Sequence, residues 1–348
     1  MYPVKAYAAL APGQPLSPWT FDRRDLGQKD VLIDIHFCGI CHSDIHQVRD
    51  EWGHSQYPMV PGHEIAGIVA QAGAKVKNFK PGDKVGVGCL VDSCRECPDC
   101  RDHLEQFCVR PSFTYNSHEQ DGKTPTHGGY STRIVVNEDF VLSLPQNLPL
   151  DGAAPLLCAG ITTYSPLKHW NAGPGKKVGV IGLGGLGHMA VKIGRALGAE
   201  ISVLSRSRSK EADAKRLGAH HYHAMTEPGA FEKLAHSFDL ILCTASVDVD
   251  WNRYLNTLKR DGTMVILGVP PKAPAVSASS LIFGRHNLSG SLIGGIKETQ
   301  EMLDFCGKHN IVSDIEIMPV QKVNQAYERV IQGDVKFRFV IDIASLNK

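Results

Sequence analysis

The sequence lacks an excess of charge of either sign. Its 348 residues contain 37 Lys plus Arg against 36 Asp plus Glu, which leaves a formal net charge of +1. A chain without a basic surplus has no general field to hold a polyanion or an anionic membrane surface. We therefore expect neither nucleic acids nor membranes among its partners.

Long apolar runs and a leader segment are also missing. The longest apolar stretches, such as 239–245 and 264–269, are far shorter than the roughly 18 residues that a membrane span needs. Residues 1–14 contain no continuous apolar stretch followed by a small-residue cleavage site, so we predict no secretory signal. We expect a cytoplasmic protein, in which the 10 cysteines stay reduced.

The composition and length indicate two compact domains. Hydrophobic residues make up 43% and charged residues 21% of the chain, a balance typical of globular proteins that excludes disorder. The length suits two domains of roughly 150 residues each. Residues 31–87 carry short alternating apolar runs broken by Gly and Pro, a pattern typical of strands and loops.

The pattern changes at Lys177. Strands expected at 178–181, 201–204, 240–243 and 264–267 alternate with helices, which predicts an α/β fold with a parallel sheet covered on both faces. This six-strand unit closes near Leu292. We expect the tail, with helices over 298–308 and 323–331 and a strand over 337–341, to return to the first domain. The predicted domains are residues 1–153 with 292–348, and residues 154–291.

Four cysteines lie within fifteen residues, in the stretch CRECPDCRDHLEQFC. These are Cys94, Cys97, Cys100 and Cys108. Four thiolates at this spacing can enclose a tetrahedral zinc and leave no open position, so we predict a structural zinc site. A zinc ribbon for nucleic acid is the alternative, but acidic residues rather than basic and aromatic ones separate these cysteines.

A second set of metal-binding residues occurs in GICHSDIH and PGHE. Catalytic zinc uses three protein ligands and keeps one open position, and two thiolates with one imidazole form one such set. Cys41 and His63 supply two ligands. The third must be a distant thiolate, and Cys158 in PLLCAGITTY is the candidate, a choice that rests partly on the resemblance given below. The isolated Cys38, Cys89, Cys243 and Cys306 are interpreted as small buried hydrophobic residues.

Polar residues beside these ligands have two interpretations each. Asp44 either orients His63 or caps a helix. Glu64 either enters the zinc shell or binds a buried arginine. Ser43 and His46 either relay a proton from the metal site or are ordinary polar residues at a helix start. Trp52, Tyr115 and Trp170 either line an apolar substrate pocket or pack in the core.

A glycine-rich turn follows the strand expected at 178–181. The sequence GLGGLG places Gly182, Gly184, Gly185 and Gly187 between this strand and a helical stretch. Glycines here allow a tight turn and let the backbone approach a pyrophosphate at the start of the helix. The strand before and the helix after the motif predict a dinucleotide site.

The second strand of the unit ends without an acid. NAD enzymes place a carboxylate there for the ribose hydroxyls, but no acid lies between Ile201 and Lys210. The residues that follow the strand are Ser205, Arg206, Ser207 and Lys210, whose hydroxyls and charges suit a 2′-phosphate. We predict NADP(H) over NAD(H). A solvated basic helix start is the alternative.

These motifs resemble the zinc-dependent medium-chain alcohol dehydrogenases, in particular the cinnamyl alcohol dehydrogenase-like branch and its bacterial NADPH-dependent aldehyde reductases. The resemblance covers essentially the whole chain. It is carried by GICHSDIH, EWGHSQYPMVPGHE, the cluster of four cysteines, LLCAGITTYSPL, GLGGLGH and LSRSRSK. It implies a GroES-like, mostly-β catalytic domain interrupted by a Rossmann domain, two zinc ions per subunit and a homodimer joined through edge strands of the Rossmann sheets.

The resemblance also implies roles for single residues. Cys41, His63 and Cys158 are the implied catalytic zinc ligands, with Glu64 as an alternative fourth ligand. Ser43 and His46 form the implied proton relay. Leu186 and Thr162 are expected at the cofactor site with the glycines. The implied reaction is reversible hydride transfer between NADPH and aromatic or aliphatic aldehydes, which gives primary alcohols.

Two other functions are compatible with parts of the sequence. An NAD-dependent polyol or secondary-alcohol dehydrogenase is disfavoured because position 205 is not an acid. A nucleotide-binding sensor or structural protein could keep the fold without turnover, but an open zinc set argues against it.

Overall fold

The computed structural model describes residues 1–347, which form two compact units. The first unit combines Met1–Cys158 with the chain from Gly294 onward, and the second unit is Ala159–Ile293. The sequence predicts boundaries after residues 153 and 291. The first boundary differs because the 3-10 helix η3 (Ala154–Leu157) packs on the sheet of the first unit.

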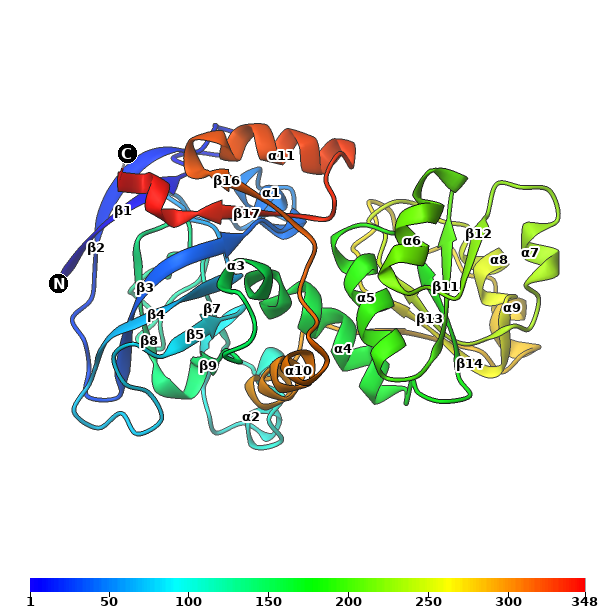
Figure 1. Cartoon of the computed structure of the whole chain (residues 1–348), viewed down its shortest axis with the longest axis horizontal. Coiled ribbons are helices and arrows are strands. Elements are labelled where there is room, and N and C mark those ends of the chain that lie inside the picture. The colour runs from blue at the N-terminus through cyan, green and yellow to red at the C-terminus, as the bar shows by residue number, and fades with distance from the viewer. Residues whose placement is uncertain (348) are drawn as a thin grey trace. The chain divides into compact units, whose positions relative to one another are not determined.

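A seven-stranded, mostly antiparallel sheet forms the centre of the first unit (Figure 1). The strand order is β16-β17-β3-β4-β5-β9, and β8 pairs with β3 beside this path. Its strands are β3 (Asp30–Gly39), β4 (Ile65–Ala72), β5 (Lys84–Val87), β8 (Arg133–Asn137), β9 (Leu142–Ser143), β16 (Ile315–Pro319) and β17 (Arg338–Asp342). Two smaller pairs are β1 (Tyr2–Ala8) with β2 (Ser17–Arg23), and β6 (Leu90–Asp92) with β7 (Ser112–Phe113).

Strand β3 is the hub of this sheet, because it pairs with β4, β8 and β17. The alternation that predicts the strand places Val31, Ile33 and Ile35 in the core, where they are at most 5% exposed. Leu32 is 1% exposed as well, so β3 is covered on both faces in this stretch. A strand buried on both sides gives the neighbouring metal-site residues a rigid support.

Short helices surround the sheet of the first unit. They are α1 (His42–Val48), α2 (Pro98–Arg101), α3 (Leu150–Ala153), α10 (Ile296–His309) and α11 (Val323–Gln332), with the 3-10 helices η1 (Glu105–Phe107), η2 (Glu138–Phe140), η5 (Val320–Lys322) and η6 (Ile343–Asn347). Helix α11 packs beside α1, and α10 packs on β9 (Figure 1). Both α10 and α11 end at a left-handed residue, Asn310 and Gly333, which stops each helix there.

The second unit is a six-stranded, fully parallel sheet in the order β12-β11-β10-β13-β14-β15. Its strands are β10 (Lys177–Ile181), β11 (Glu200–Ser205), β12 (His221–Ala224), β13 (Phe238–Cys243), β14 (Leu258–Ile266) and β15 (Asn287–Gly290). Its helices are α4 (Ala159–His169), α5 (Gly185–Ala196), η4 (Arg208–Lys210), α6 (Glu211–Leu217), α7 (Ala230–Lys233), α8 (Trp251–Leu255) and α9 (Ala278–Ile282). This is the strand order of the dinucleotide-binding fold.

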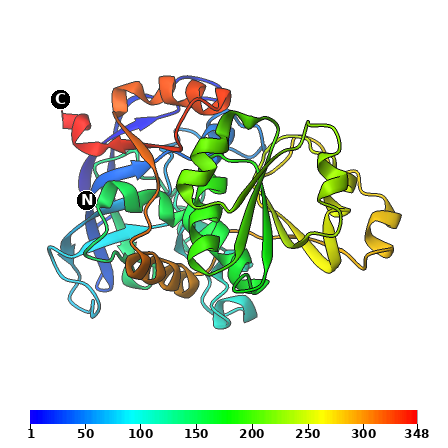
Figure 2. The same ribbon diagram turned by 45° about the vertical axis from the view of Figure 1, so that its right-hand side comes forward.

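Helices cover both faces of this parallel sheet. Helices α5 and α6 lie on one face, and α8 and α9 lie on the other (Figures 1 and 2). The strand order reverses beside β10, so the loop that follows β10 opens at the switch point where such folds bind ligands. That loop contains the glycine motif.

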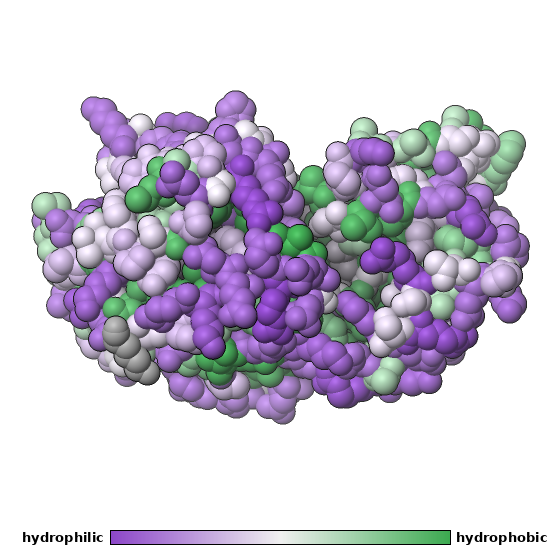
Figure 3. All heavy atoms as spheres, turned by 90° about the horizontal axis from the view of Figure 1, so that it is seen from above, coloured by the Kyte–Doolittle hydropathy of each residue, from purple (hydrophilic) through white to green (hydrophobic). Residues whose placement is uncertain are grey.

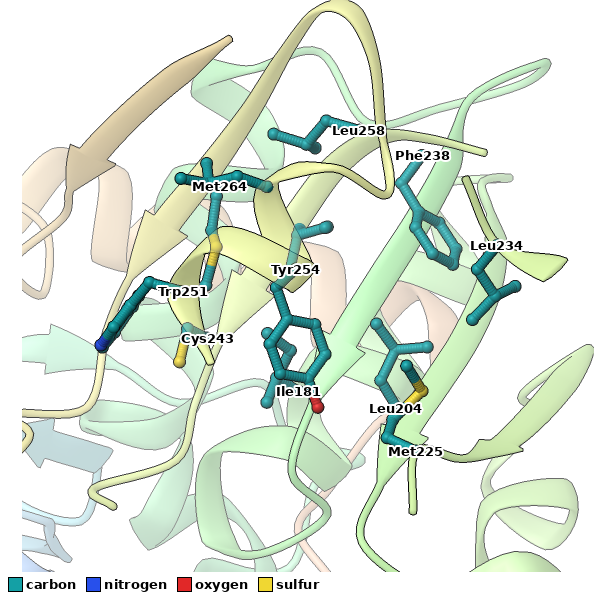
Figure 4. Packing of buried hydrophobic residues seen from close by; sticks show 12 residues of the cluster. Ile181, Leu204, Met225, Leu234, Phe238, Cys243, Trp251, Tyr254, Leu258 and Met264 are labelled. Atoms are coloured by element: carbon teal, nitrogen blue, oxygen red, sulfur yellow. The ribbon is translucent and has the colours of Figure 1, made fainter. Parts of the chain in front are cut away.

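One buried cluster of the second unit lies between the sheet and the helices on one of its faces. Twelve buried residues form it, and Figure 4 shows the side chains of Leu204, Met225 and Phe238 among them. Ile241, Leu255 and Met264 have no measurable exposure. Burial of several large side chains, at roughly 1.5–3 kcal/mol each, stabilises the ends of β11 and β13 on this face of the sheet.

The visible face in Figure 3 is mainly hydrophilic, with apolar residues in scattered groups. Single exposed apolar residues are ordinary for a globular chain. Among residues 1–347, no helix has the length and the apolar character that crossing a membrane requires.

Candidate active site and cofactor site

The first metal-site residue lies where strand β3 passes into helix α1. Cys41 is the N-cap of α1, and the Asp44 carboxylate accepts a hydrogen bond of 2.9 Å from its backbone N–H. Asp44 is completely buried and lies 3.2 Å from Nδ1 of His63. The two interpretations of Asp44 are therefore compatible, because one carboxylate caps the helix and contacts the imidazole.

Four donor residues meet in the interior of the first unit. The ligand atoms of Cys41, His63, Glu64 and Cys158 all lie within 4.8 Å of one another, and all four residues are buried. The Sγ atoms of Cys41 and Cys158 are 3.8 Å apart. Two sulfurs bound to one tetrahedral zinc at about 2.3 Å are separated by about 3.8 Å. The thiol spacing therefore fits one zinc ion.

Glu64 carries an orphaned buried carboxylate. Neither of its oxygens has a hydrogen-bond partner among residues 1–347, and the nearest cation is Nη2 of Arg338, 3.4 Å from Oε1. Burial raises the pKa of Glu64 to about 8, although Arg338 acts to lower it. A buried carboxyl group without donors is costly unless a cation reaches it, so this donor set suits a metal.

Arg338 brings positive charge to the same place from strand β17. It is 6% exposed and donates a hydrogen bond of 3.1 Å to the carbonyl of Ile40. Burial by itself lowers the pKa of Arg338, but the charges of Glu64 and Cys41 raise it above its ordinary value. Contact with Cys158 lowers the pKa of Cys41, and Arg338 lowers it further. The thiolate form that binds metals is favoured there.

The side chains predicted to relay a proton lie on α1. The Ser43 hydroxyl lies 3.6 Å from Sγ of Cys41. Nδ1 of His46 contacts a carboxylate oxygen of Glu51, and the His46 ring stacks on the rings of His42 and Trp52. Within residues 1–347, no hydrogen bond joins Ser43 to His46 directly.

The aromatic residues considered for the aldehyde pocket have different surroundings. Tyr115 is 7% exposed and stacks on His63 with ring centroids 5.8 Å apart. Trp52 is 42% exposed beside His46. Trp170 belongs to the second unit, where its ring meets His169 edge to face. Only Tyr115 and Trp52 contact residues of the candidate metal site and relay.

The four clustered cysteines converge as a separate closed set. The Sγ atoms of Cys94, Cys97, Cys100 and Cys108 lie within 4.8 Å of one another. Backbone N–H groups donate to two of these sulfurs at 3.3–3.4 Å. The Sγ of Cys108 accepts from the N–H groups of Cys94 and Arg110, and the Sγ of Cys94 accepts from the N–H of Cys97. These amide donors suit thiolates, and backbone contacts lower the pKa of Cys94 to about 6. With four sulfurs, the set fits a structural zinc.

The glycine motif forms a tight turn between β10 and α5. Gly182 has a φ of +88°, a conformation that favours glycine. A Cβ at Gly187 would lie 2.2 Å from the carbonyl oxygen of Gly182, so only glycine permits this approach of helix and strand. A Cβ at Gly184 would meet nothing within 4 Å. The turn leaves open space beside Gly184, at the start of α5, where a pyrophosphate can approach the backbone.

Helix α4 and the turn carry the remaining residues predicted at the cofactor site. Thr162 is 7% exposed on α4, which packs beside α5. Leu186 lies in the first turn of α5, next to Gly187. Lys210 donates a hydrogen bond of 2.9 Å to the carbonyl of Leu183 and so ties the segment after β11 to the glycine turn.

The segment after β11 contains two arginines with different surroundings. Arg208 is bound by two carboxylates, Glu227 and Glu211, with N–O distances of 2.6–3.0 Å. Arg206 is exposed and has no ion-pair partner in the part of the chain that the structure describes. The Ser207 hydroxyl caps η4 by accepting from the N–H of Ser209. Arg206 is therefore the arginine available to a ligand.

Sequence reasoning missed several residues around the metal site. Glu51 follows His46 by five residues but carries no distinguishing motif. Tyr130 donates a hydrogen bond of 3.1 Å to Asp44 from far along the chain. Cys89, interpreted as an isolated buried hydrophobic residue, makes a side-chain contact with Cys158 that lowers its pKa. Arg338 had no sequence signal at all, because only the folded sheet brings β17 beside Glu64.

A dinucleotide-type sheet together with two separate zinc-compatible donor sets defines a class, the metal-dependent dehydrogenases. Two family models match the chain, the Alcohol dehydrogenase GroES-like domain over residues 27–146 and the Zinc-binding dehydrogenase over residues 185–308.

Individual relatives cover the whole chain. The NADP-dependent alcohol dehydrogenase C 1 of Mycolicibacterium smegmatis is 59% identical over 99% of both chains. Aldehyde reductase YahK of Escherichia coli is 51% identical, also over 99% of both. The cinnamyl alcohol dehydrogenase of Helicobacter pylori complexed with NADP(H) is 46% identical, with a TM-score of 0.93 over 99% of both chains.

The chain belongs to the zinc-dependent medium-chain alcohol dehydrogenases, in their cinnamyl alcohol dehydrogenase-like branch. This finding confirms the predicted family. It also confirms the predicted fold, a GroES-like, mostly-β domain interrupted in sequence by a Rossmann domain.

Proposed function

We propose that this protein is a zinc-dependent, NADP(H)-dependent alcohol dehydrogenase that works as an aldehyde reductase. It would interconvert aromatic or aliphatic aldehydes and primary alcohols. The observation that carries this proposal is the buried donor set with Cys41 and Cys158 spaced for one zinc ion. Relatives named NADP-dependent alcohol dehydrogenase and aldehyde reductase, at 59% and 51% identity, support the cofactor and the reaction.

In this proposal Cys41, His63 and Cys158 hold the catalytic zinc, and Glu64 is the alternative fourth ligand. A zinc ion in this set supplies a Lewis acid that polarises a carbonyl oxygen. Asp44 would fix the His63 tautomer, because its carboxylate beside Nδ1 keeps the proton there and leaves Nε2 for the metal. Arg338 would compete with the metal for Glu64 and so favour an open position for substrate.

The side chains of α1 would handle the proton. In reduction, the Ser43 hydroxyl would donate to the oxygen of the nascent alcohol, and His46 would restore that proton. Glu51 contacts His46 and its side chain is 42% exposed, which gives the relay an outlet to solvent. Because Ser43 and His46 are not hydrogen-bonded, a water or a ligand hydroxyl would have to bridge them.

In the second unit, the glycine turn would hold the pyrophosphate of the cofactor. Gly182, Gly184, Gly185, Leu186 and Gly187 form this turn and the start of α5. NADPH supplies the hydride. Thr162 would approach the cofactor from α4, while Ser205, Arg206, Ser207 and Lys210 would bind the 2′-phosphate.

The two arginines after β11 provide a matched test of this phosphate site. Replacing Arg206 by Ala, alone or with Lys210→Ala, should raise the apparent KM for NADPH about tenfold, because one charge-assisted contact is lost. The KM for NADH should hardly change. Arg208→Ala should leave the KM for NADPH and the KM for NADH nearly unaltered, because the Arg208 side chain is already paired with the carboxylates of Glu227 and Glu211. Equal effects of Arg206→Ala on both cofactors would contradict the assignment.

Zinc dependence is tested by NADPH absorbance loss with benzaldehyde before and after chelation. We expect activity to disappear when about one zinc per chain has been removed from the catalytic set, and to return when zinc is restored. Metal content measured on the same samples links the two changes. NADPH consumption that continues after both zinc ions are gone would overturn the proposal.

We also propose a cytoplasmic homodimer joined through β15. This strand is an edge of the parallel sheet, and edge strands present unpaired backbone groups that can pair with a second copy. Nearby apolar side chains support the proposal, because Ile282 is 71% exposed and Phe283 is 90% exposed.

A further inference from the structure

Three consecutive carbonyl oxygens, from the last residue of β11 and the two residues after it, are bound by one neighbouring segment. The carbonyl of Ser205 accepts from the N–H of Met225 at 2.7 Å. The carbonyl of Arg206 accepts from the Thr226 hydroxyl at 2.6 Å, and that of Ser207 accepts from the Tyr222 hydroxyl at 2.5 Å. We call residues 222–226 the carbonyl clamp. Two of its three bonds come from side chains, so sequence rather than backbone geometry decides them.

The orientation of these carbonyls matters for an anion. A carbonyl oxygen is the negative end of the peptide dipole and repels a phosphate, whereas N–H groups, hydroxyls and guanidinium groups attract it. Residues 206 and 207 lie beyond the ladder between β11 and β12, so their peptide planes are free of that constraint and can rotate. If a carbonyl of residues 205–207 turned toward a phosphate, it would cancel part of the attraction from Arg206.

The clamp has a firm base in the core of the second unit. Met225 is 7% exposed, and its side chain lies against Leu204 in the buried cluster (Figure 4). Strand β12 pairs with β11 up to the register Ser205–Ala224. Beyond the clamp, Glu227 binds Arg208 through two N–O contacts of 2.6 and 2.9 Å. This ion pair is solvent-exposed and holds the Arg208 side chain, so the three bonds of the clamp are what orient the carbonyls.

We propose that Tyr222 and Thr226 are positioning residues for 2′-phosphate recognition, because they hold the carbonyls of Ser207 and Arg206 away from the phosphate side of the segment. They act through the backbone and need not touch the cofactor. This inference rests on the proposed role of residues 205–210 in binding NADPH. The two hydroxyl groups would then contribute to NADP(H) selectivity in addition to the charged side chains of Arg206 and Lys210.

The test compares cofactor binding by Tyr222→Phe and Thr226→Val in the full-length, zinc-loaded enzyme. Each variant should raise the Kd for NADPH about three- to tenfold, the effect of losing one net hydrogen bond. The Kd for NADH should stay within about twofold of the wild-type value, because NADH has no 2′-phosphate. Thr226→Ser keeps the hydroxyl and should restore NADPH binding.

A matched control is Tyr254→Phe, which removes the hydroxyl of a tyrosine that packs in the same buried cluster as Met225 but, among residues 1–347, donates no hydrogen bond to the carbonyls of residues 205–207. It should leave both dissociation constants unchanged. A rise in Kd for both cofactors with Tyr222→Phe would indicate general loosening and would overturn the inference. Unchanged NADPH binding in both Tyr222→Phe and Thr226→Val would overturn it equally.

The parallel variant Arg206→Ala with Lys210→Ala separates this inference from the proposed function. If that variant fails to weaken NADPH binding selectively, residues 205–210 do not bind the phosphate, and the proposed site itself fails. If it does so while the clamp variants have no effect, the site stands and only the positioning role is refuted.

Discussion

At the residue scale, Asp44 connects the metal site to the fold. Its carboxylate receives hydrogen bonds from the Cys41 N–H, the Gly62 N–H and the Tyr130 hydroxyl, and it lies beside His63. A charge with no exposure is tolerated only when several donors surround it. The same carboxylate therefore sets the start of α1 and the orientation of the imidazole, so neither can move alone.

The surroundings of His127 indicate that the native state loses stability in acid. Its ring meets Trp19 and Phe21 edge to face, and burial and then the charge of Arg23 lower its pKa to about 4. Between about pH 6.5 and 4 the unfolded chain takes up a proton that the native ring refuses, so native stability falls as the pH falls. After allowance for the partial exposure of the ring, this difference in protonation of His127 lowers the free energy of unfolding by about 2 kcal/mol at the acidic end of the range.

The variant His127→Phe keeps the ring contacts and removes this titration. We expect its urea midpoint, relative to that of the wild type, to increase progressively from pH 7 to pH 4.5. The candidate zinc ligands are the same in both proteins, so their titration cancels in the comparison. A constant difference between the two proteins over this range would mean that His127 is as readily protonated in the native state as in the unfolded chain.

Single residues also mark how far the sequence could lead. The spacing of Cys41, His63 and the four clustered cysteines in the sequence was enough to predict them as metal-binding residues. The structure brings the ligand atoms of each of the two sites close together. Arg338 and Tyr130 could not be found this way, because they reach the site through pairing of distant strands rather than through a local motif. The contact between Cys89 and Cys158 could not be predicted either, because an isolated cysteine gives no spacing signal.

At the element scale, two glycines of the turn have different functions. Gly187 is needed for the packing of α5 against β10, and Gly184 for the proposed approach of the pyrophosphate. The Gly187→Ala change places a methyl group 2.2 Å from the carbonyl oxygen of Gly182, so α5 must shift away from β10. We expect a loss of about 2 kcal/mol in the free energy of unfolding, together with weak NADPH binding. Thermal unfolding and fluorescence titration with NADPH measure the two effects.

Gly184→Ala is the matched control. Its Cβ meets nothing within 4 Å, and the φ of Gly184, −124°, suits alanine. We expect unchanged stability but about a tenfold loss of NADPH affinity, because the methyl group occupies space where the pyrophosphate would approach. Wild-type binding by this variant would show that the cofactor does not approach the turn at Gly184.

Element types were more predictable than their ends. The alternation of strands and helices after Lys177 indicates the parallel sheet, and β10, β11, β13 and β14 lie at the predicted apolar runs. Strand β12, the polar stretch His221–Ala224, was not predicted. Strands β13 and β14 begin earlier than predicted because pairing with neighbours extends them into polar residues such as Asp239 and Lys259. Helix α10 begins two residues early because the Glu105 carboxylate accepts from the N–H of Ile296 at its start.

At the scale of the whole molecule, the proposed dimer predicts a dependence on Phe283. This side chain is 90% exposed at the end of α9, a few residues before the edge strand β15 in the sequence, and large exposed apolar side chains are unfavourable in an isolated chain. Phe283→Asp should shift the mass measured by light scattering from two chains to one, because a charge would be buried in the interface.

Leu10→Asp is the control for this experiment, since Leu10 is also an exposed apolar residue, at 50%, but lies in the first unit. It should leave the mass unchanged. A wild-type protein that is already monomeric, or a dimer that persists in Phe283→Asp, would remove the proposed contact at β15.

The order in which the chain returns to its first sheet has a consequence for biosynthesis. The second unit is continuous from Ala159 to Ile293, so a ribosome delivers all of it before residue 338 exists. Strand β17, which pairs with β3 and places Arg338 beside Glu64, is translated after the whole of the second unit. The nascent chain therefore carries exposed cysteine and histidine donors for most of its synthesis. We therefore expect the metal-binding residues to reach their final geometry only after the second unit has been synthesised.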